Sequence, residues 1–209
     1  MNIISNILDN LLSFFFTISG DWGIAITFLT VFIRVILLPL SIKQKVNIEK
    51  NQDLYKSMEE IRKIYKNNKG KLETEMQKLY KQNIKGMLVN SVGLLQIPIV
   101  LALYNVILKM PVQESTLIIP WVTSIKMIDS YLIVPVIYTL IILSPYLLSY
   151  IPFFKTSFQA KVSKANLIFT SIFSILITFK TPIAVGIYFI TTGFFSLVEE
   201  VVFRLYLKK

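Results

Sequence analysis

Thr30-Val31-Phe32-Ile33-Arg34-Val35-Ile36-Leu37-Leu38-Pro39 is an apolar stretch that holds one arginine and has no acidic residue near it in the sequence. A segment of this kind is typical of a helix that crosses a membrane. A charged side chain at the centre of a bilayer costs at least about 2.5–3.5 kcal/mol, so a charge that is kept there indicates a functional site. Arg34 is therefore the first candidate functional residue.

The alternative for Arg34 is a side chain that snorkels to the membrane surface. The next basic residue, Lys43, follows so far along the chain that a helix would separate the two by about 13 Å. That distance is too long for an easy reach, so we favour function over snorkelling.

The composition of the whole chain predicts a polytopic membrane protein. Of its 209 residues, 54% are hydrophobic and 16% charged, and the mean hydropathy is +0.63. A soluble domain of this size needs a more polar surface. The chain has no cysteine and no histidine, which excludes disulfides, imidazole or thiolate metal sites, and catalysis by either side chain. We expect no enzymatic activity, no metal and no cofactor.

The first part of the chain, residues 1–20, predicts an external amphipathic helix that lies on the membrane. Gly20 and Asp21 end this segment, and Trp22 is a candidate interface anchor. The apolar residues at helical spacing are Ile3, Ile4, Ile7, Leu8, Leu11, Leu12 and Phe15.

The remaining chain, residues 21–209, predicts an all-α core with five transmembrane helices. Between residues 43 and 85, Lys and Arg outnumber Asp and Glu by two to one, which favours a cytoplasmic location and places the N-terminus outside and the C-terminus inside. The last apolar stretch could be one tilted helix, but Pro182 and the charge bias favour two spans. The expected spans cover approximately residues 23–41, 87–108, 131–150, 165–179 and 183–203.

Residues 43–85 predict a cytoplasmic antiparallel helical hairpin. Asn67-Asn68-Lys69-Gly70 is a turn signal between two segments with helical periodicity. The lysines fit a solvated face, with contact to lipid headgroups or a ribosome as the alternative. The apolar positions of the two segments pair along one seam as Tyr65/Leu72, Ile61/Met76 and Met58/Leu79, with Leu54/Asn83 as the one pair that is not apolar on both sides.

Three groups of short motifs occur in a characteristic order around this hairpin. Gly20-Asp21-Trp22-Gly23 leads to Arg34 and Leu37-Leu38-Pro39-Leu40, followed by Gln96-Ile97-Pro98 with Ala102-Leu103-Tyr104, and by Pro182-Ile183-Ala184-Val185-Gly186-Ile187-Tyr188-Phe189. In this order, and over nearly the whole chain, the sequence resembles the YidC-type membrane protein insertases, whose relatives work in mitochondria and chloroplasts.

The resemblance implies a five-helix core around a hydrophilic groove that is open to the cytoplasm and to lipid. It implies that Arg34 is the groove arginine, that Gln96 is a polar groove position, and that Thr30 and Tyr188 contact substrate. The alternatives are that Gln96 joins two helices, that Tyr188 is a packing aromatic, and that Thr30 bonds to its own helix.

Departures from the family pattern occur near the end of the chain. A common Leu-Tyr-Trp reads Ile187-Tyr188-Phe189, a common asparagine is Gly193, and a pair of glutamines reads Glu199-Glu200. Glu200 and Arg204 have the i, i+4 spacing of a helical ion pair, which favours a structural role for both.

The predicted function is a membrane protein insertase and chaperone in the bacterial plasma membrane. It would capture hydrophilic segments of nascent membrane proteins at Arg34 and release apolar segments into the lipid bilayer. We expect a functional monomer without a specific nucleic-acid partner, and leave the ribosome and the Sec translocon open as partners. The alternatives are a small secondary transporter that binds an anionic solute at Arg34, which lacks a clear internal repeat, and a factor that only chaperones membrane subunits.

Overall fold

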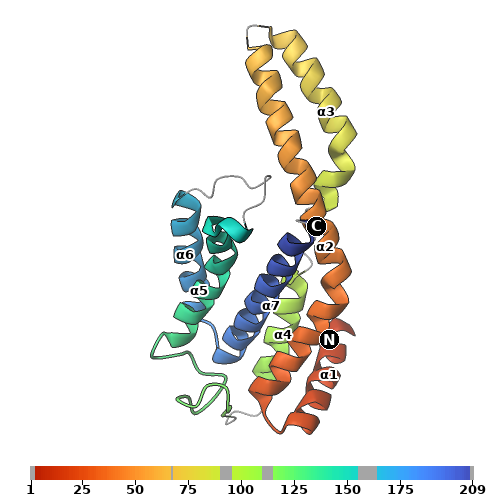
Figure 1. The fold of residues 1–209 in the computed structure, drawn as a ribbon. Helices are drawn as coiled ribbons and strands as arrows, with labels where there is room; N and C mark the ends of the chain where they lie inside the picture. Colours follow the sequence, from red (N-terminus) through yellow and green to blue (C-terminus); the bar gives the residue numbers. More distant parts are fainter. Residues whose placement is uncertain (1–2, 67, 90–95, 110–114, 155–163, 208–209) are drawn as a thin grey trace. The chain divides into compact units, whose positions relative to one another are not determined.

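The computed structural model describes residues 3–66, 68–89, 96–109, 115–154 and 164–207, and within these ranges the fold is all helical (Figure 1). The prediction of an all-α protein is confirmed for this part of the chain. The elements are α1 (Ile3–Ser19), α2 (Trp22–Ile64), α3 (Lys69–Val89), α4 (Gln96–Lys109), α5 (Ile133–Leu147), η2 (Leu148–Tyr150), η3 (Pro152–Phe154), α6 (Lys164–Phe179) and α7 (Ile183–Leu207).

Two of the described helices are long and apolar enough to cross a membrane, namely Trp22–Asn47 of α2 and Ile183–Tyr206 of α7. Ile133–Leu147 and Leu167–Phe179 are shorter apolar helices. The expected span at residues 87–108 starts in α3 and ends in α4, and its residues 90–95 lie outside the described ranges.

The chain divides into two compact units, one formed by Met1–Ile36 with Pro98–Lys209 and the other by Leu37–Ile97. In the first unit, α5 packs against both α6 and α7. The hydroxyls of Thr139 and Ser174 lie 2.9 Å apart and join α5 to α6. Between α5 and α7 the approach is so close that a Cβ on Gly186 would lie 2.5 Å from a methyl group of Val134. Small residues permit such close helix packing inside membranes.

Helix α1 packs against α2 through its aromatic side chains. The Phe16 ring stacks on Trp22 at 4.0 Å, and Phe15 meets Phe28 and Phe32 at 6.0 and 6.1 Å between ring centroids. Gly20, with φ of 67°, turns the chain between the two helices. The buried Leu8 and Leu12 belong to the hydrophobic core. Part of the apolar face of α1 therefore meets protein, whereas the sequence favoured a helix lying on the membrane surface.

Residues 115–132 form hydrogen bonds to the N-terminal ends of both α2 and α7. Both carboxylate oxygens of Asp21 accept hydrogen bonds from this segment, from the Thr116 hydroxyl at 2.8 Å and from the Leu117 N–H at 2.8 Å. Two carbonyls of the same segment accept the N–H groups of Ile183 and Ala184 at the start of α7. These N–H groups have no partner within their own helix, so the segment completes the N-terminus of α7.

The second unit contains the end of α2 and the helix α3, which run side by side in opposite directions (Figure 1). Met58 and Ile61 on α2 and Tyr65 just after it are buried or half-buried, and most of their neighbours are exposed. Leu72, Met76 and Leu79 on α3 are half-buried as well. This burial agrees with the predicted seam. The sequence suggested a span that ends at a basic stretch, but α2 continues as one helix through Pro39 and the following lysines.

Candidate functional site

Arg34 lies on α2 and interacts electrostatically with three side chains from two other helices. These are Tyr188 and Glu199 on α7 and Tyr138 on α5. We call these four residues the Arg34 cluster. All four belong to the first unit of the chain. The structure thereby brings two of the predicted site residues, Arg34 and Tyr188, to the same place.

Two members of the Arg34 cluster are buried and two are half-buried. Tyr188 is 4% exposed and Glu199 is 7% exposed, while Arg34 and Tyr138 are half-buried. The Tyr138 ring stacks on Phe189 at 5.3 Å between centroids, which fixes one side of the cluster. Charges interact more strongly in such surroundings than in bulk water, because the effective dielectric constant is lower.

Thr30 lies about one turn before Arg34 on α2. Thr30 is 1% exposed, and its hydroxyl donates a 2.6 Å hydrogen bond to the carbonyl of Ile26 one turn earlier. This bond is the back-bonding alternative that the sequence left open for Thr30. Gln96 is the first residue of α4, and its side chain lies outside the described part of the chain.

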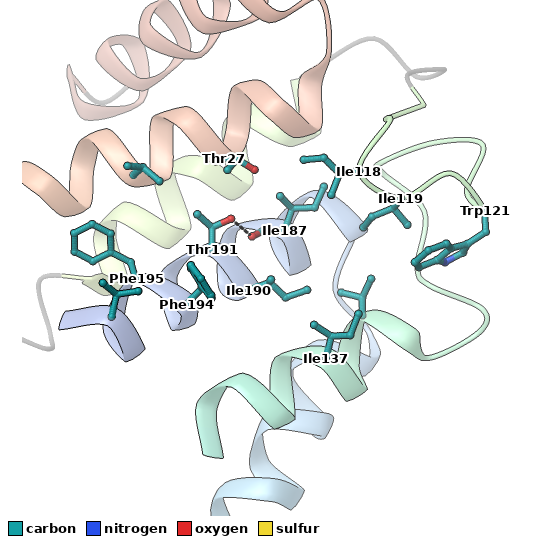
Figure 2. A pocket seen from close by; sticks show the side chains of 13 residues that line it. Thr27, Ile118, Ile119, Trp121, Ile137, Ile187, Ile190, Thr191, Phe194 and Phe195 are labelled. Carbon is teal, nitrogen blue, oxygen red and sulfur yellow. Dashed lines mark hydrogen bonds between the residues drawn. The ribbon is translucent and has the colours of Figure 1, made fainter. Parts of the chain in front are cut away.

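A cavity of about 590 Å³ lies between α2, α5, α7 and residues 115–132 (Figure 2). The hydroxyls of Thr27 and Thr191 donate hydrogen bonds to the carbonyls of Gly23 and Ile187, so their hydrogens are not available to a ligand. The wall is otherwise apolar. It consists of Thr27, Val31, Ile118, Ile119, Trp121, Val134, Ile137, Ile187, Ile190, Thr191, Phe194, Phe195 and Val198.

The apolar cavity and the Arg34 cluster follow one another along the same two helices. Val31 lines the cavity, and Arg34 follows it by about one turn of α2. Val198 lines the cavity on α7, and Glu199 is the next residue. A ligand with an apolar part next to an anionic part would match this succession of an apolar wall and a cationic group.

The sequence did not indicate Tyr138 or Glu199 as neighbours of Arg34. Glu199 carried a weak signal, because it is an acidic residue inside an apolar helix, and such residues usually face a partner. Tyr138 carried none, since tyrosine is common in membrane helices and near their ends.

Comparison with known proteins identifies the family. A family model described as "60Kd inner membrane protein" matches residues 14–209. The chain belongs to this family. Within it, the chain is 33% identical to a protein of Helicobacter pylori over 195 residues and 31% identical to one of Caldanaerobacter subterraneus over 208 residues. A protein of Wolinella succinogenes is 32% identical over 194 residues. All three relatives carry the name "Membrane protein insertase YidC".

The relatives of the 60Kd inner membrane protein family differ in length. The match covers 92% of the chain but 34% of the Helicobacter protein, and 91% of the chain but 35% of the Wolinella protein. It covers 97% of the chain and 95% of the Caldanaerobacter protein. Family membership and the long apolar helices α2 and α7 together indicate an integral membrane protein.

Proposed function

We propose that this protein inserts other proteins into the membrane, with Arg34 as the group that attracts acidic client segments. The observation that carries the proposal is the cationic Arg34 directly beyond an apolar cavity on the same helices. The relatives are named as membrane protein insertases, which supports the proposal.

The barrier to insertion is the desolvation of the polar part of the client. A client must move a hydrophilic tail across the bilayer while its apolar segment enters lipid, and each unpaired polar group costs several kcal/mol in hydrocarbon. A hydrophilic groove that is open to the cytoplasm and reaches partway through the bilayer would shorten the dry path. We place Arg34 within this groove, and propose Gln96 as a further polar group of its wall.

Arginine suits this role for two reasons. Its guanidinium stays protonated at all physiological pH values, and it can hold a carboxylate with two parallel hydrogen bonds. Half-burial of Arg34 strengthens its attraction for an acidic tail relative to the same charge in water. Tyr188 and Tyr138 would add hydroxyl groups to the same place, and Thr30 would have to give up its bond to Ile26 in order to contact a client.

Release follows from the apolar part of the client. Moving one CH₂ group out of water is favourable by roughly 0.8 kcal/mol of transfer free energy. The transfer free energy of a full apolar segment is therefore larger than the binding free energy of one ionic contact. The cavity between α2, α5 and α7 offers an apolar surface on which that segment could rest before it moves into lipid. No covalent bond forms or breaks in this process.

We also propose the topology that the charges favour. The five spans, at approximately residues 23–41, 87–108, 131–150, 165–179 and 183–203, would place the hairpin at residues 43–85 and the C-terminus in the cytoplasm. Residues 1–20 would form an external amphipathic helix before the segment 21–209, with Leu8 and Leu12 packed into the hydrophobic core. Because the chain has no cysteine, single cysteines at Thr123 and Lys71 can report this directly. A membrane-impermeant thiol reagent should label the first in intact cells and the second only after lysis.

The partners in this proposal are nascent membrane proteins and the lipid bilayer, with the protein active as a monomer. The ribosome and the Sec translocon are further proposed partners, and the basic hairpin is the surface that would meet a ribosome.

Site-specific crosslinking tests the proposal. A photoreactive residue at position 34, 96, 138 or 188 should crosslink to a stalled nascent membrane protein, with position 71 on the hairpin as a control outside the groove. Crosslinks to lipid alone from all four positions would contradict the proposed client site.

A further inference from the structure

Glu199 is a buried acidic residue in a helix that we propose to span the membrane. It is 7% exposed, and the other charged residues of α7 are Glu200 and Arg204. Arg204 donates a 2.8 Å hydrogen bond to Glu200, and its other nitrogens donate to the carbonyls of Phe154 and Pro145. Consecutive helical residues point about 100° apart, so Glu199 and Glu200 point in different directions.

Helices α7 and α2 border the same cavity at this level, through Val198 and Val31. Arg34 follows Val31 by one turn, and Glu199 follows Val198 by one residue. The electrostatic interaction between Arg34 and Glu199 agrees with this placement. A buried carboxylate within a membrane helix is costly unless a cation offsets it, and Arg34 offsets it here.

We propose that Glu199 is a resident counter-ion of Arg34 that determines how acidic a client segment must be in order to bind. This inference rests on the proposed function of Arg34. With Glu199 in place, an incoming carboxylate must either displace Glu199 or bind next to a like charge. Either one reduces the free energy that the carboxylate gains by binding to Arg34. A tail with several acidic residues overcomes this competition, whereas a tail with one does not. Glu199 therefore acts as a specificity residue.

The purely structural alternative is that Glu199 only balances the charge of Arg34. In that case its loss would lower stability and reduce the insertion of all clients to the same degree. The two roles thus differ in one quantity, which is the ratio of insertion between strongly and weakly acidic clients.

The test uses the full chain reconstituted in vesicles that contain no other insertase. The clients are one model protein with zero, one or four aspartates in its translocated tail. We expect Glu199→Gln to raise insertion of the one-aspartate client several-fold and to lower the ratio of four-aspartate to one-aspartate insertion. Glu199→Asp, which keeps the charge, should retain the wild-type ratio. Glu199→Met, similar in volume and uncharged, gives a second neutral variant if Glu199→Gln does not fold.

Glu200→Gln is the matched control, because it makes the same chemical change one residue away, where the partner is Arg204. We expect it to lower thermal stability and to leave the client ratio unchanged. An unchanged ratio in both neutral variants of Glu199, or an equal loss for every client, would overturn the counter-ion role.

A comparison with Arg34→Ala separates this inference from the proposed function. In the combined Arg34→Ala and Glu199→Gln variant, the effect of Glu199→Gln on the ratio should vanish, since the two residues act through one another. If Arg34→Ala alone leaves insertion of every client unchanged, the proposed function fails. If Arg34→Ala abolishes the dependence on acidic residues and Glu199→Gln leaves it intact, only the counter-ion role fails.

Discussion

The hydroxyl of Thr116 donates a 2.8 Å hydrogen bond to Oδ1 of Asp21, which lies 95 positions earlier in the chain. The same oxygen caps α2 by accepting the N–H of Ile24 at 2.9 Å. Oδ2 accepts the N–H of Leu117 at 2.8 Å. One carboxylate therefore begins the helix that carries Arg34 and ties residues 115–132 to it.

Asp21→Asn should lower the thermal stability of the protein. The amide nitrogen of asparagine cannot accept a hydrogen bond, so at least one of the three donors loses its partner, at a cost of about 1–3 kcal/mol. Unfolding in detergent can be followed by the fluorescence of Trp22 and Trp121, which lie near the two ends of this contact. Asp9→Asn is the control, since Asp9 is exposed on α1, and an equal loss in both variants would contradict the role of Asp21.

The contribution of Asp21 should depend on pH. Burial raises the pKa of this carboxyl, but the hydrogen bonds from Ile24, Leu117 and Thr116 outweigh burial, and the pKa lies below its ordinary value. A lowered pKa means that the stabilisation is fully present above the pKa of the unfolded chain, about 3.9, and is lost as the pH falls through the folded value. The stability difference between wild type and Asp21→Asn should therefore stay constant from pH 7 to 5 and shrink below about pH 4. A difference that already shrinks between pH 7 and 5 would contradict this.

Gly23→Ala should destabilise the same contact for a steric reason. A Cβ at position 23 would overlap the Thr116 hydroxyl and lie 3.0 Å from its Cβ. Gly70→Ala is a matched control, because nothing lies within 4 Å of a Cβ there, and the position is in the first turn of α3. Alanine favours helix over glycine by up to about 1 kcal/mol, so Gly70→Ala should be neutral or slightly stabilising. Equal melting temperatures for the two variants would show that Thr116 moves aside without cost.

Arg204→Lys should lower stability although it keeps the charge. Arg204 is buried and uses three nitrogens on three acceptors, namely Glu200 and the carbonyls of Pro145 and Phe154. A lysine ammonium cannot reach all three in this planar arrangement. Arg204→Ala should be the more severe change, because it leaves Glu200 and two carbonyls without their donor, and each lost partner costs about 1–3 kcal/mol. The measurement is thermal unfolding of both variants, and wild-type stability of Arg204→Lys would refute the requirement for the guanidinium.

Much of the fold was predictable because it depends on local periodicity. The apolar spacing around Met58 and Met76 predicted the seam of the hairpin, and Gly20 with Asp21 predicted the break before α2. The ion pair between Glu200 and Arg204 was indicated by its i, i+4 spacing and is confirmed at 2.8 Å.

Two features of the helices, the continuation of α2 beyond its apolar part and the packing of α1 on α2, are not determined by local periodicity. The change from apolar to charged residues near Lys43 predicts the end of a span but not the end of the helix, which continues because lysine, glutamine and glutamate are good helix formers. The sequence does not predict the packing of Phe15 and Phe16 on α2, since an amphipathic pattern fits a protein surface as well as a membrane.

At the site, the sequence indicated Arg34 through the cost of its charge, but not its neighbours. Glu199 and Tyr138 lie far from Arg34 along the chain, and only the packing of α2 with α5 and α7 brings them close. The family resemblance implies that Thr30 contacts substrate, and the structure places its hydroxyl against its own helix.

The most direct test is the insertion of a client with an acidic translocated tail into vesicles in which an Arg34 variant is the only insertase. We predict that Arg34→Ala strongly reduces insertion of this client, that Arg34→Lys largely preserves it, and that a client with a neutral tail depends little on either change. Insertion of the acidic client at the wild-type rate by Arg34→Ala would contradict electrostatic capture at Arg34.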